Sequence, residues 1–424
     1  MKCENEPISY DDHGDIPFEV PFREIPSSEI SIYLQLDTRV GQATCRQRCA
    51  HCFYINQPAA ADRMVDLEEG RRIMDSLRRH GFRVFPMIAD SLAQDGQFLR
   101  LFGNTHNRDY RQELECVPTK TMARGDCWTS GAPLMDDNWR DILTECIVTG
   151  FGSVTITFHG VLDEHLALRP HDTYPIKGVF PGFKCEEVIR RIRQFNADML
   201  RGDIEALDGV PKELVQPLAV NIGLTIGRHN YSSQHLRRYV DYFNRLNVDV
   251  LRFNRFHDHG FRLPGLTLSN EEVAVWYRDL KAIHENVELG FQLGVDEDFG
   301  TSGIEVMAFP AHTGWCRAGR QLFAVVPEPP AIVARTGRSV VESIGTIAAC
   351  VDAFKPLVGR LERFTDMATG ETDYDLRFDV EAIDLLNQKR VSGVYSDGCF
   401  AVEMLDEDRQ KSRAAAGIKL QMAN

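Results

Sequence analysis

The sequence lacks the features that would place it in a membrane, on nucleic acid or outside the cell. Its longest apolar runs, such as 323–326 and the stretch around 340–354, are short or broken by charge, far below the length that a bilayer requires. Lysine and arginine number 48 against 62 aspartates and glutamates, and the formal charge of −14 repels a phosphate backbone. Residues 1–22 are acidic and contain prolines, where a signal peptide needs a basic start and an apolar run. We therefore expect a cytoplasmic protein with no membrane and no nucleic-acid partner.

The composition is that of an ordinary globular protein. The chain has 424 residues, of which 43% are hydrophobic and 26% charged, so it is long enough for one large domain or two modest ones. Disorder and a disulfide-stapled miniprotein are excluded. Its 11 cysteines should be reduced in the cytoplasm, which makes them buried apolar groups or metal ligands rather than disulfides.

From residue 30 to residue 300, β-rich and helical segments alternate. The run ISIYLQL at 30–36 predicts a buried strand, and the spacing of apolar residues predicts the other elements. The further strands are expected at 82–88, 153–158, 218–226, 248–254 and 289–294, and the helices at 65–81, 138–150, 183–196, 232–246 and 269–285. Such alternation indicates parallel strands covered by helices.

The sequence divides into four parts. We expect an extended arm at 1–29, a core at 30–300, a smaller α+β appendage at 301–405 and a polar tail at 406–424. The appendage should contain a hairpin at 320–333 and a helix across 339–359. The core is less regular between residues 94 and 134, where 113–119 is a candidate for a further strand.

Three cysteines lie close together directly after the first strand. Cys45, Cys49 and Cys52 are separated by three and then two residues, so one loop can present three thiolates to one metal centre. Structural zinc takes four protein ligands and iron–sulfur cubanes usually four cysteines, so three would leave one iron open. The alternatives are unrelated buried thiols, or a zinc site completed by His51 or a remote residue.

With this spacing in this loop, the chain resembles the radical S-adenosylmethionine (SAM) superfamily over about residues 30–300. The resemblance implies an α/β fold with a partial (β/α)6 TIM-type barrel. It also implies a [4Fe-4S] cluster on Cys45, Cys49 and Cys52, whose fourth iron binds the amino and carboxylate groups of SAM. Reductive cleavage would release a 5′-deoxyadenosyl radical that abstracts a substrate hydrogen, with electrons from an external donor such as flavodoxin or ferredoxin.

The resemblance also suggests SAM contacts at the strand ends. Ala89 and Asp90 stand where the family has glycine and glutamate, and Asp90 would hold the SAM amino group. Thr157 would contact the ribose, Arg169 would pair with the carboxylate, and Asn230 matches another SAM contact. The alternatives are a strand-end turn for Asp90 and a solvated helix arginine for Arg169.

Polar residues at the same predicted rim are candidates for substrate binding. His159 follows the strand at 153–158, where it would line the cavity or simply pack. Arg255, His257 and Asp258 follow a later strand and could bind or protonate a polar substrate. A metal site formed by His257 and His259 is the alternative. We favour one histidine that faces the pocket and one that is structural.

The appendage resembles the SPASM or twitch auxiliary-cluster domains at its start, Trp315-Cys316. The hairpin that follows has no cysteine across 327–338, which leaves Cys350 and Cys399 downstream. We therefore expect a degenerate cap without a cluster. An auxiliary iron–sulfur cluster that recruits core cysteines stays open; the candidates are Cys116, Cys127, Cys146 and Cys185.

These patterns favour a radical SAM enzyme acting on a small polar molecule, such as a sugar, aminocyclitol or nucleoside, in the biosynthesis of a specialised metabolite. One alternative is a SPASM-like maturase that modifies a ribosomally made peptide. The other is a zinc-binding α/β protein without catalysis.

Overall fold

The computed structural model of the chain describes most of the core and the appendage. The described residues are 16–17, 19–36, 67–88, 90–93, 96, 98–100, 125–161, 163–168, 173–176, 179–210, 215–256, 263, 265–295, 316–350, 356–392 and 404. Within these ranges, no helix combines the length and the apolar character needed to span a bilayer.

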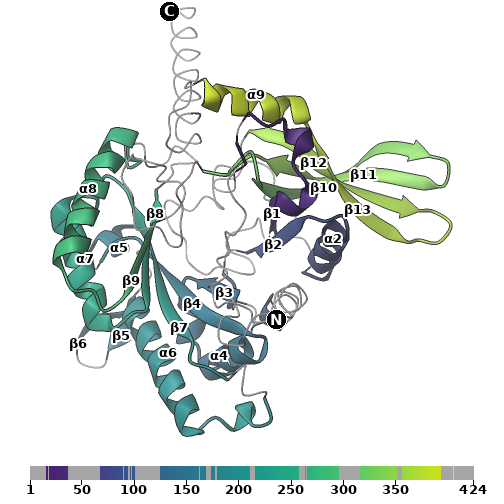
Figure 1. Cartoon of the computed structure of the whole chain (residues 1–424). Helices are drawn as coiled ribbons and strands as arrows, with labels where there is room; N and C mark the ends of the chain where they lie inside the picture. The colour runs from purple at the N-terminus through teal and green to yellow at the C-terminus, as the bar shows by residue number, and fades with distance from the viewer. Residues whose placement is uncertain are drawn as a thin grey trace, which may run out of the picture.

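A five-stranded parallel sheet forms one part of the core. Its strands follow the order β3-β4-β7-β8-β9, and helices connect them and cover one face (Figure 1). The strands are β3 (Gly125–Thr129), β4 (Phe151–Phe158), β7 (Ala219–Ile226), β8 (Val250–Arg255) and β9 (Gln292–Val295). The helices are α4 (Trp139–Val148), α5 (Asp163–Leu168), α6 (Lys184–Arg201), α7 (Ser233–Leu246) and α8 (Asn270–Asn286), and a small ribbon of β5 (Thr173–Ile176) and β6 (Val179–Phe183) precedes α6.

The other sheet joins the start of the chain to its C-terminal part. Its order is β13-β12-β11-β10-β1-β2, in which β1 pairs in parallel with both β2 and β10, and β10 to β13 pair antiparallel. The strands are β1 (Ser31–Gln35), β2 (Arg83–Met87), β10 (Leu322–Thr336), β11 (Ser339–Ala348), β12 (Leu357–Asp366) and β13 (Thr372–Phe378). Helices α2 (Leu67–Arg79) and α9 (Val380–Val391) accompany this sheet, and the ends of its hairpins extend away from the body (Figure 1).

Local sequence signals set the ends of the helices. Ser232 caps α7 by accepting a hydrogen bond from a backbone N–H. Ser269 and Glu272 form a capping box at the start of α8. Gly81 follows the last turn of α2 with a φ of 91°, a conformation that glycine adopts without strain. These are the residues at which the sequence predicts the helix ends.

The parallel α/β architecture with a C-terminal α+β part is confirmed, but several elements differ from the prediction. The hairpin expected at 320–333 is wrong, because the single strand β10 covers most of these residues and its turn to β11 comes after Thr336. The helix expected across 339–359 is wrong: β11 and the start of β12 lie in this region, because the segment VVESIGTI is rich in β-branched residues, which favour paired strands. Strand β3 at 125–129 was not predicted, and the candidate at 113–119 lies outside the described residues. The described core has seven parallel strands rather than six, in two sheets.

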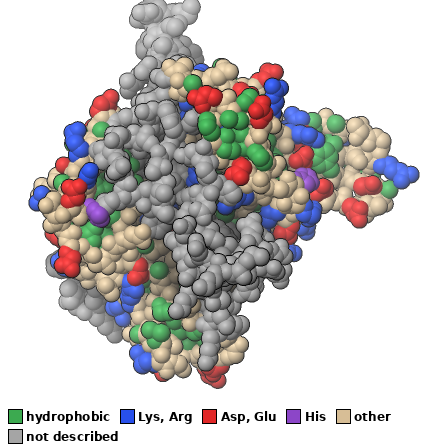
Figure 2. All heavy atoms as spheres, in the orientation of Figure 1, with side chains coloured by type: hydrophobic (Ala, Val, Ile, Leu, Met, Phe, Trp, Pro, Cys, Tyr) green, Lys and Arg blue, Asp and Glu red, His purple; other side chains and the backbone are tan. Residues whose placement is uncertain are grey.

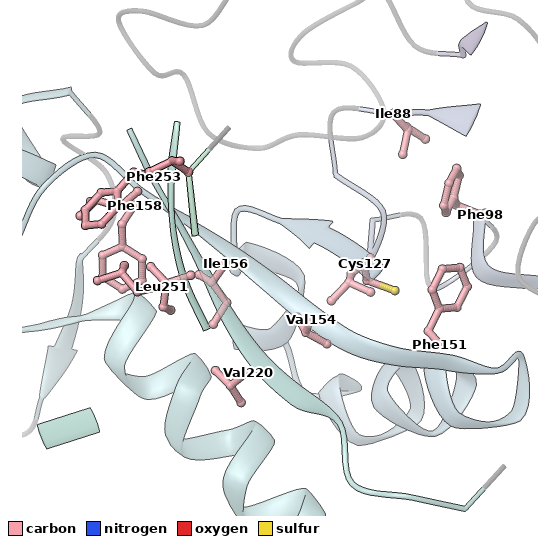
Figure 3. Packing of buried hydrophobic residues seen from close by; sticks show 14 of the residues in the cluster. Ile88, Phe98, Cys127, Phe151, Val154, Ile156, Phe158, Val220, Leu251 and Phe253 are labelled. Carbon is pink, nitrogen blue, oxygen red and sulfur yellow. The ribbon is translucent and has the colours of Figure 1, made fainter. Parts of the chain in front are cut away.

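The hydrophobic core extends along the six-stranded sheet through residues such as Ile32 and Phe323, and another part of it lies between the five-stranded sheet and its helices. Every second residue of the central strands is fully buried there, and Figure 3 shows Val154, Ile156, Val220 and Leu251 on this side. The helices contribute complementary apolar faces, such as Phe243 of α7. Burying each such side chain stabilises the fold by about 1.5–3 kcal/mol.

The visible surface of the described residues is mixed in charge. Figure 2 shows acidic and basic side chains interspersed over this face of the molecule, although the net charge is negative. Interspersed charge favours solubility.

Candidate functional site

Strand β1 leads into the segment that carries the three predicted cluster ligands. Cys45, Cys49 and Cys52 lie outside the described residues, so their coordination stays a prediction. The described frame fits it: β1 lies inside the six-stranded sheet and ends at Gln35, which is fully buried. A loop that leaves here starts at the carboxyl edge of parallel strands, where such folds bind ligands. Three thiolates on one loop are a donor set that leaves one iron of a cubane open.

Asp90 lies beyond the end of β2 and is almost fully buried. Its Oδ1 accepts hydrogen bonds from Thr129 Oγ1 (2.8 Å) and Leu92 N (3.2 Å). Its Oδ2 accepts from Ser130 Oγ (2.6 Å) and Ser130 N (3.0 Å). Burial raises the pKa of Asp90, and these hydrogen bonds oppose the shift. The carboxylate thus ties the end of β2 to the end of β3, and the predicted contact with the SAM amino group would come in addition to these four bonds.

Asn230 connects the ends of β4 and β7. Its Oδ1 accepts a hydrogen bond from Gly227 N (2.8 Å), and its Nδ2 donates to Thr225 O (2.9 Å) and to His159 O (3.5 Å). The side chain is fully buried. Asn230 therefore fixes the rim of the sheet, and its predicted contact with SAM remains a prediction.

The end of β4 carries two more predicted residues. Thr157 is half-buried and in register with Gly223 of β7. His159 is buried, and its Nδ1 lies 3.3 Å from Thr225 Oγ1. The backbone N–H of His159 donates to Nδ1 of His165 (3.1 Å), so the fully buried His165 holds no proton at that atom.

Of the remaining predicted site residues, the structure describes only Arg255. Arg255 ends β8, is buried, and donates a hydrogen bond from Nη2 to the backbone carbonyl of Leu268. This contact holds the segment before α8 against the strand. Arg169, His257 and Asp258 lie outside the described residues.

His229 is a rim residue that the sequence did not single out. Its Nε2 lies 3.4 Å from the carbonyl oxygen of His159, which again joins the ends of β7 and β4. Burial lowers the pKa of His229, and the nearby His235 adds to this shift. His229 is therefore more readily neutral than a solvent-exposed histidine.

The predictions from sequence did not include the polar residues within the strands of the five-stranded sheet. Asp126 on β3 accepts hydrogen bonds from Ser153 Oγ (2.7 Å) and Thr155 Oγ1 (2.6 Å) of β4. Arg252 on β8 lies over the ring of Trp128, with its guanidinium carbon 5.6 Å from the ring centroid. A signal was present, because polar residues alternate with apolar ones in SVTITF.

The described cysteines of the core are buried thiols. Cys127, Cys146 and Cys185 are fully buried, and burial together with contact to Cys146 raises the pKa of Cys127 well above its usual range. Cys316 and Cys350 are also buried, whereas Cys116 and Cys399 lie outside the described residues. Across the described ranges, no three His, Cys, Asp or Glu side chains are grouped to hold a metal. The appendage without a cluster therefore stays a prediction.

No protein-family model matches this chain, and no curated protein matches it. Solved structures that align with it include Streptococcus suis SuiB bound to S-adenosylmethionine, with 12% identity, a TM-score of 0.44, and coverage of 84% of this chain and 65% of SuiB. SuiB bound to the precursor peptide SuiA aligns at 12% identity with a TM-score of 0.43, over 70% of this chain and 57% of SuiB. TsrM from Kitasatospora setae, a radical S-adenosylmethionine methyltransferase, aligns at 16% identity with a TM-score of 0.30, over 54% of this chain and 36% of TsrM.

SuiB has thus been solved with bound S-adenosylmethionine, and TsrM is a radical S-adenosylmethionine methyltransferase. In these alignments the chain spans 57% to 65% of the length of SuiB. The identities are low and the TM-scores lie below 0.5, so the alignments carry no argument about activity or substrate.

Proposed function

We propose that the chain is a radical SAM enzyme. The observation that carries the proposal is the spacing of Cys45, Cys49 and Cys52 after β1, a strand inside a sheet whose parallel neighbour β2 ends at the same edge. Polar side chains gather at the strand ends of the described core, as such a site requires. When bound, a [4Fe-4S] cluster and SAM would supply the one-electron reduction that generates a 5′-deoxyadenosyl radical.

The chain itself would position these groups and keep water away from them. Thr157 and Arg169 are proposed to contact the ribose and the carboxylate of SAM. Asp90 and Asn230 are proposed to shape the rim around SAM, since their described hydrogen bonds fix the ends of β2, β3, β4 and β7. A rigid rim holds a bound ligand in one orientation, which is the protein's main contribution to radical chemistry on a cofactor.

Anaerobic purification tests the metal centre directly. We expect a brown protein with broad visible charge-transfer absorbance, and Cys49→Ala should lose the colour, iron and sulfide. Cys185→Ala is the matched control, because this thiol belongs to α6 and is fully buried in the core. A colourless protein that contains zinc would instead support the non-catalytic alternative.

Two substrate classes are compatible with this proposal. The polar strand ends favour a small polar metabolite as the substrate, such as a sugar, an aminocyclitol or a nucleoside. The appendage resembles SPASM domains at Trp315-Cys316, so a ribosomally made peptide is tested alongside. Deuterium transfer into 5′-deoxyadenosine from labelled candidates of each class identifies the substrate, with reduced flavodoxin or ferredoxin as the electron donor.

A further inference from the structure

The two faces of the five-stranded sheet differ in chemistry. The face under the helices is apolar, whereas the opposite face carries polar and small residues. We define this polar face by Asp126, Trp128, Thr155, Asn221, Gly223, Arg252 and Asn254. Parallel strands that are packed on both sides are usually apolar on both faces. A polar face in such a sheet therefore needs a reason other than packing.

The strand register brings the polar face together. Trp128, Thr155 and Asn221 lie side by side on β3, β4 and β7. Gly223 and Arg252 form the next pair towards the carboxyl edge, on β7 and β8. A Cβ on Gly223 would lie only 2.8 Å from the ring of Trp128, so the absence of a side chain lets the indole lie across the sheet.

The charged groups of the polar face balance each other. Burial raises the pKa of Asp126, while hydrogen bonds from Thr155 and Ser153 and the charge of Arg252 oppose this shift. Arg252 also lies over the ring of Trp128, a cation–π contact that holds the guanidinium against the sheet. Among the residues that define the face, one is acidic and one is basic, so neither sign of charge predominates, which favours a neutral ligand group over an ion.

Two asparagines flank Arg252 on this face. Asn221 lies on the neighbouring strand beside Val250, and Asn254 follows Arg252 by two residues on the same strand. The Oδ1 atoms of both are buried from solvent and accept no hydrogen bond from the described residues. Buried acceptors of this kind normally have a partner, because an unmatched one destabilises the fold. A ligand that donates hydrogen bonds would satisfy them.

We infer that the polar face binds the substrate through a neutral group that donates hydrogen bonds, with Asn221 and Asn254 as the accepting residues. This inference rests on the proposed function, because the face is a substrate site only if the chain is an enzyme. The chemistry fits the N–H of an amide or the hydroxyls of a polyol. A lone carboxylate would offer only acceptors to the two Oδ1 atoms, and an ammonium group would add charge to a balanced face.

Thermal unfolding of the cluster-loaded protein with four probes tests the inference. N-acetylglycinamide represents a peptide amide, myo-inositol represents a polyol, and acetate and methylammonium are the charged probes. We expect one neutral probe, in excess over its Kd, to raise the midpoint by about 1–3 °C. Asn254→Leu and Asn221→Leu should abolish the rise, whereas Asn286→Leu, an exposed position on α8, should retain it.

The outcomes separate the alternatives. Protection by N-acetylglycinamide favours a peptide and protection by myo-inositol favours a polyol, and either supports the inference. The inference is overturned if no probe protects the wild type, if only a charged probe does, or if both leucine variants respond like the wild type. Failure of the proposed function appears separately, as iron–sulfur absorbance that Cys49→Ala leaves unchanged.

Discussion

Neighbouring residues of the five-stranded sheet have different roles, depending on the face on which each side chain lies. On β7, Ile222 points into the core and is fully buried, whereas Asn221 and Gly223 lie on the polar face. Successive side chains of a strand point to opposite faces, so one segment can supply stability on one side and binding groups on the other. Gly223 is buried like Ile222 although it lies on the polar face, so burial alone does not identify a core residue here.

Two adjacent substitutions on β7 test the difference between the faces. Ile222→Ala should lower the free energy of unfolding by about 2–5 kcal/mol, because it removes fully buried methyl groups. Asn221→Ala should change it by less than about 1 kcal/mol, since its Oδ1 has no described partner to lose. Urea unfolding of both variants measures the difference, and equal losses would contradict the division of faces.

A polar residue whose hydrogen bonds are satisfied should behave differently from Asn221. Asn230→Ala removes three hydrogen bonds from a fully buried site and should destabilise the protein by about 1–3 kcal/mol. Asn286→Ala on the exposed part of α8 is the control. A loss no greater than that of the control, measured in the same urea titrations, would show that Asn230 does not fix the rim.

The close approach of Trp128 to the sheet gives a third test. Gly223→Ala places a methyl group 2.8 Å from the indole and should destabilise the protein by about 1–3 kcal/mol through overpacking. Trp128→Leu in the same chain should recover part of that loss, which a double-mutant cycle measures. Additive effects of the two substitutions would argue against the contact.

The smallest effect concerns pH. Because the pKa of Asp126 is raised above its ordinary value of 3.8, the folded state binds this proton more tightly than the unfolded state does. The contribution of Asp126 to stability should therefore fall as pH rises from 3.8 through its folded pKa, with a slope below about 1.4 kcal/mol per pH unit. Comparison with Asp126→Asn across this range isolates the contribution, and one that rises with pH would contradict the assigned shift.

Local signals made much of the core predictable. The serines at 232 and 269 mark the starts of α7 and α8, and Gly81 marks the end of α2. Alternation of apolar and polar residues also indicates strands such as β4. These signals act over a few residues, so one sequence is enough to detect them.

Contacts between distant segments could not be predicted in the same way. Strand β1 pairs with β10, and Asp90 binds Ser130 across 40 residues, although nothing local in either segment marks its partner. Residues 339–359 were misread because a short apolar run fits a helix or a strand until its neighbours are known. The polar face was missed for the same reason: its residues come from four strands and become a group only through the register.

The most direct test of the central claim is the product formed from SAM under reducing, anaerobic conditions. The wild-type protein with dithionite should convert SAM to 5′-deoxyadenosine and methionine, whereas Cys49→Ala, with an unchanged circular dichroism spectrum, should form neither. Equal 5′-deoxyadenosine production by the two proteins would contradict the assignment of this chain to radical SAM chemistry.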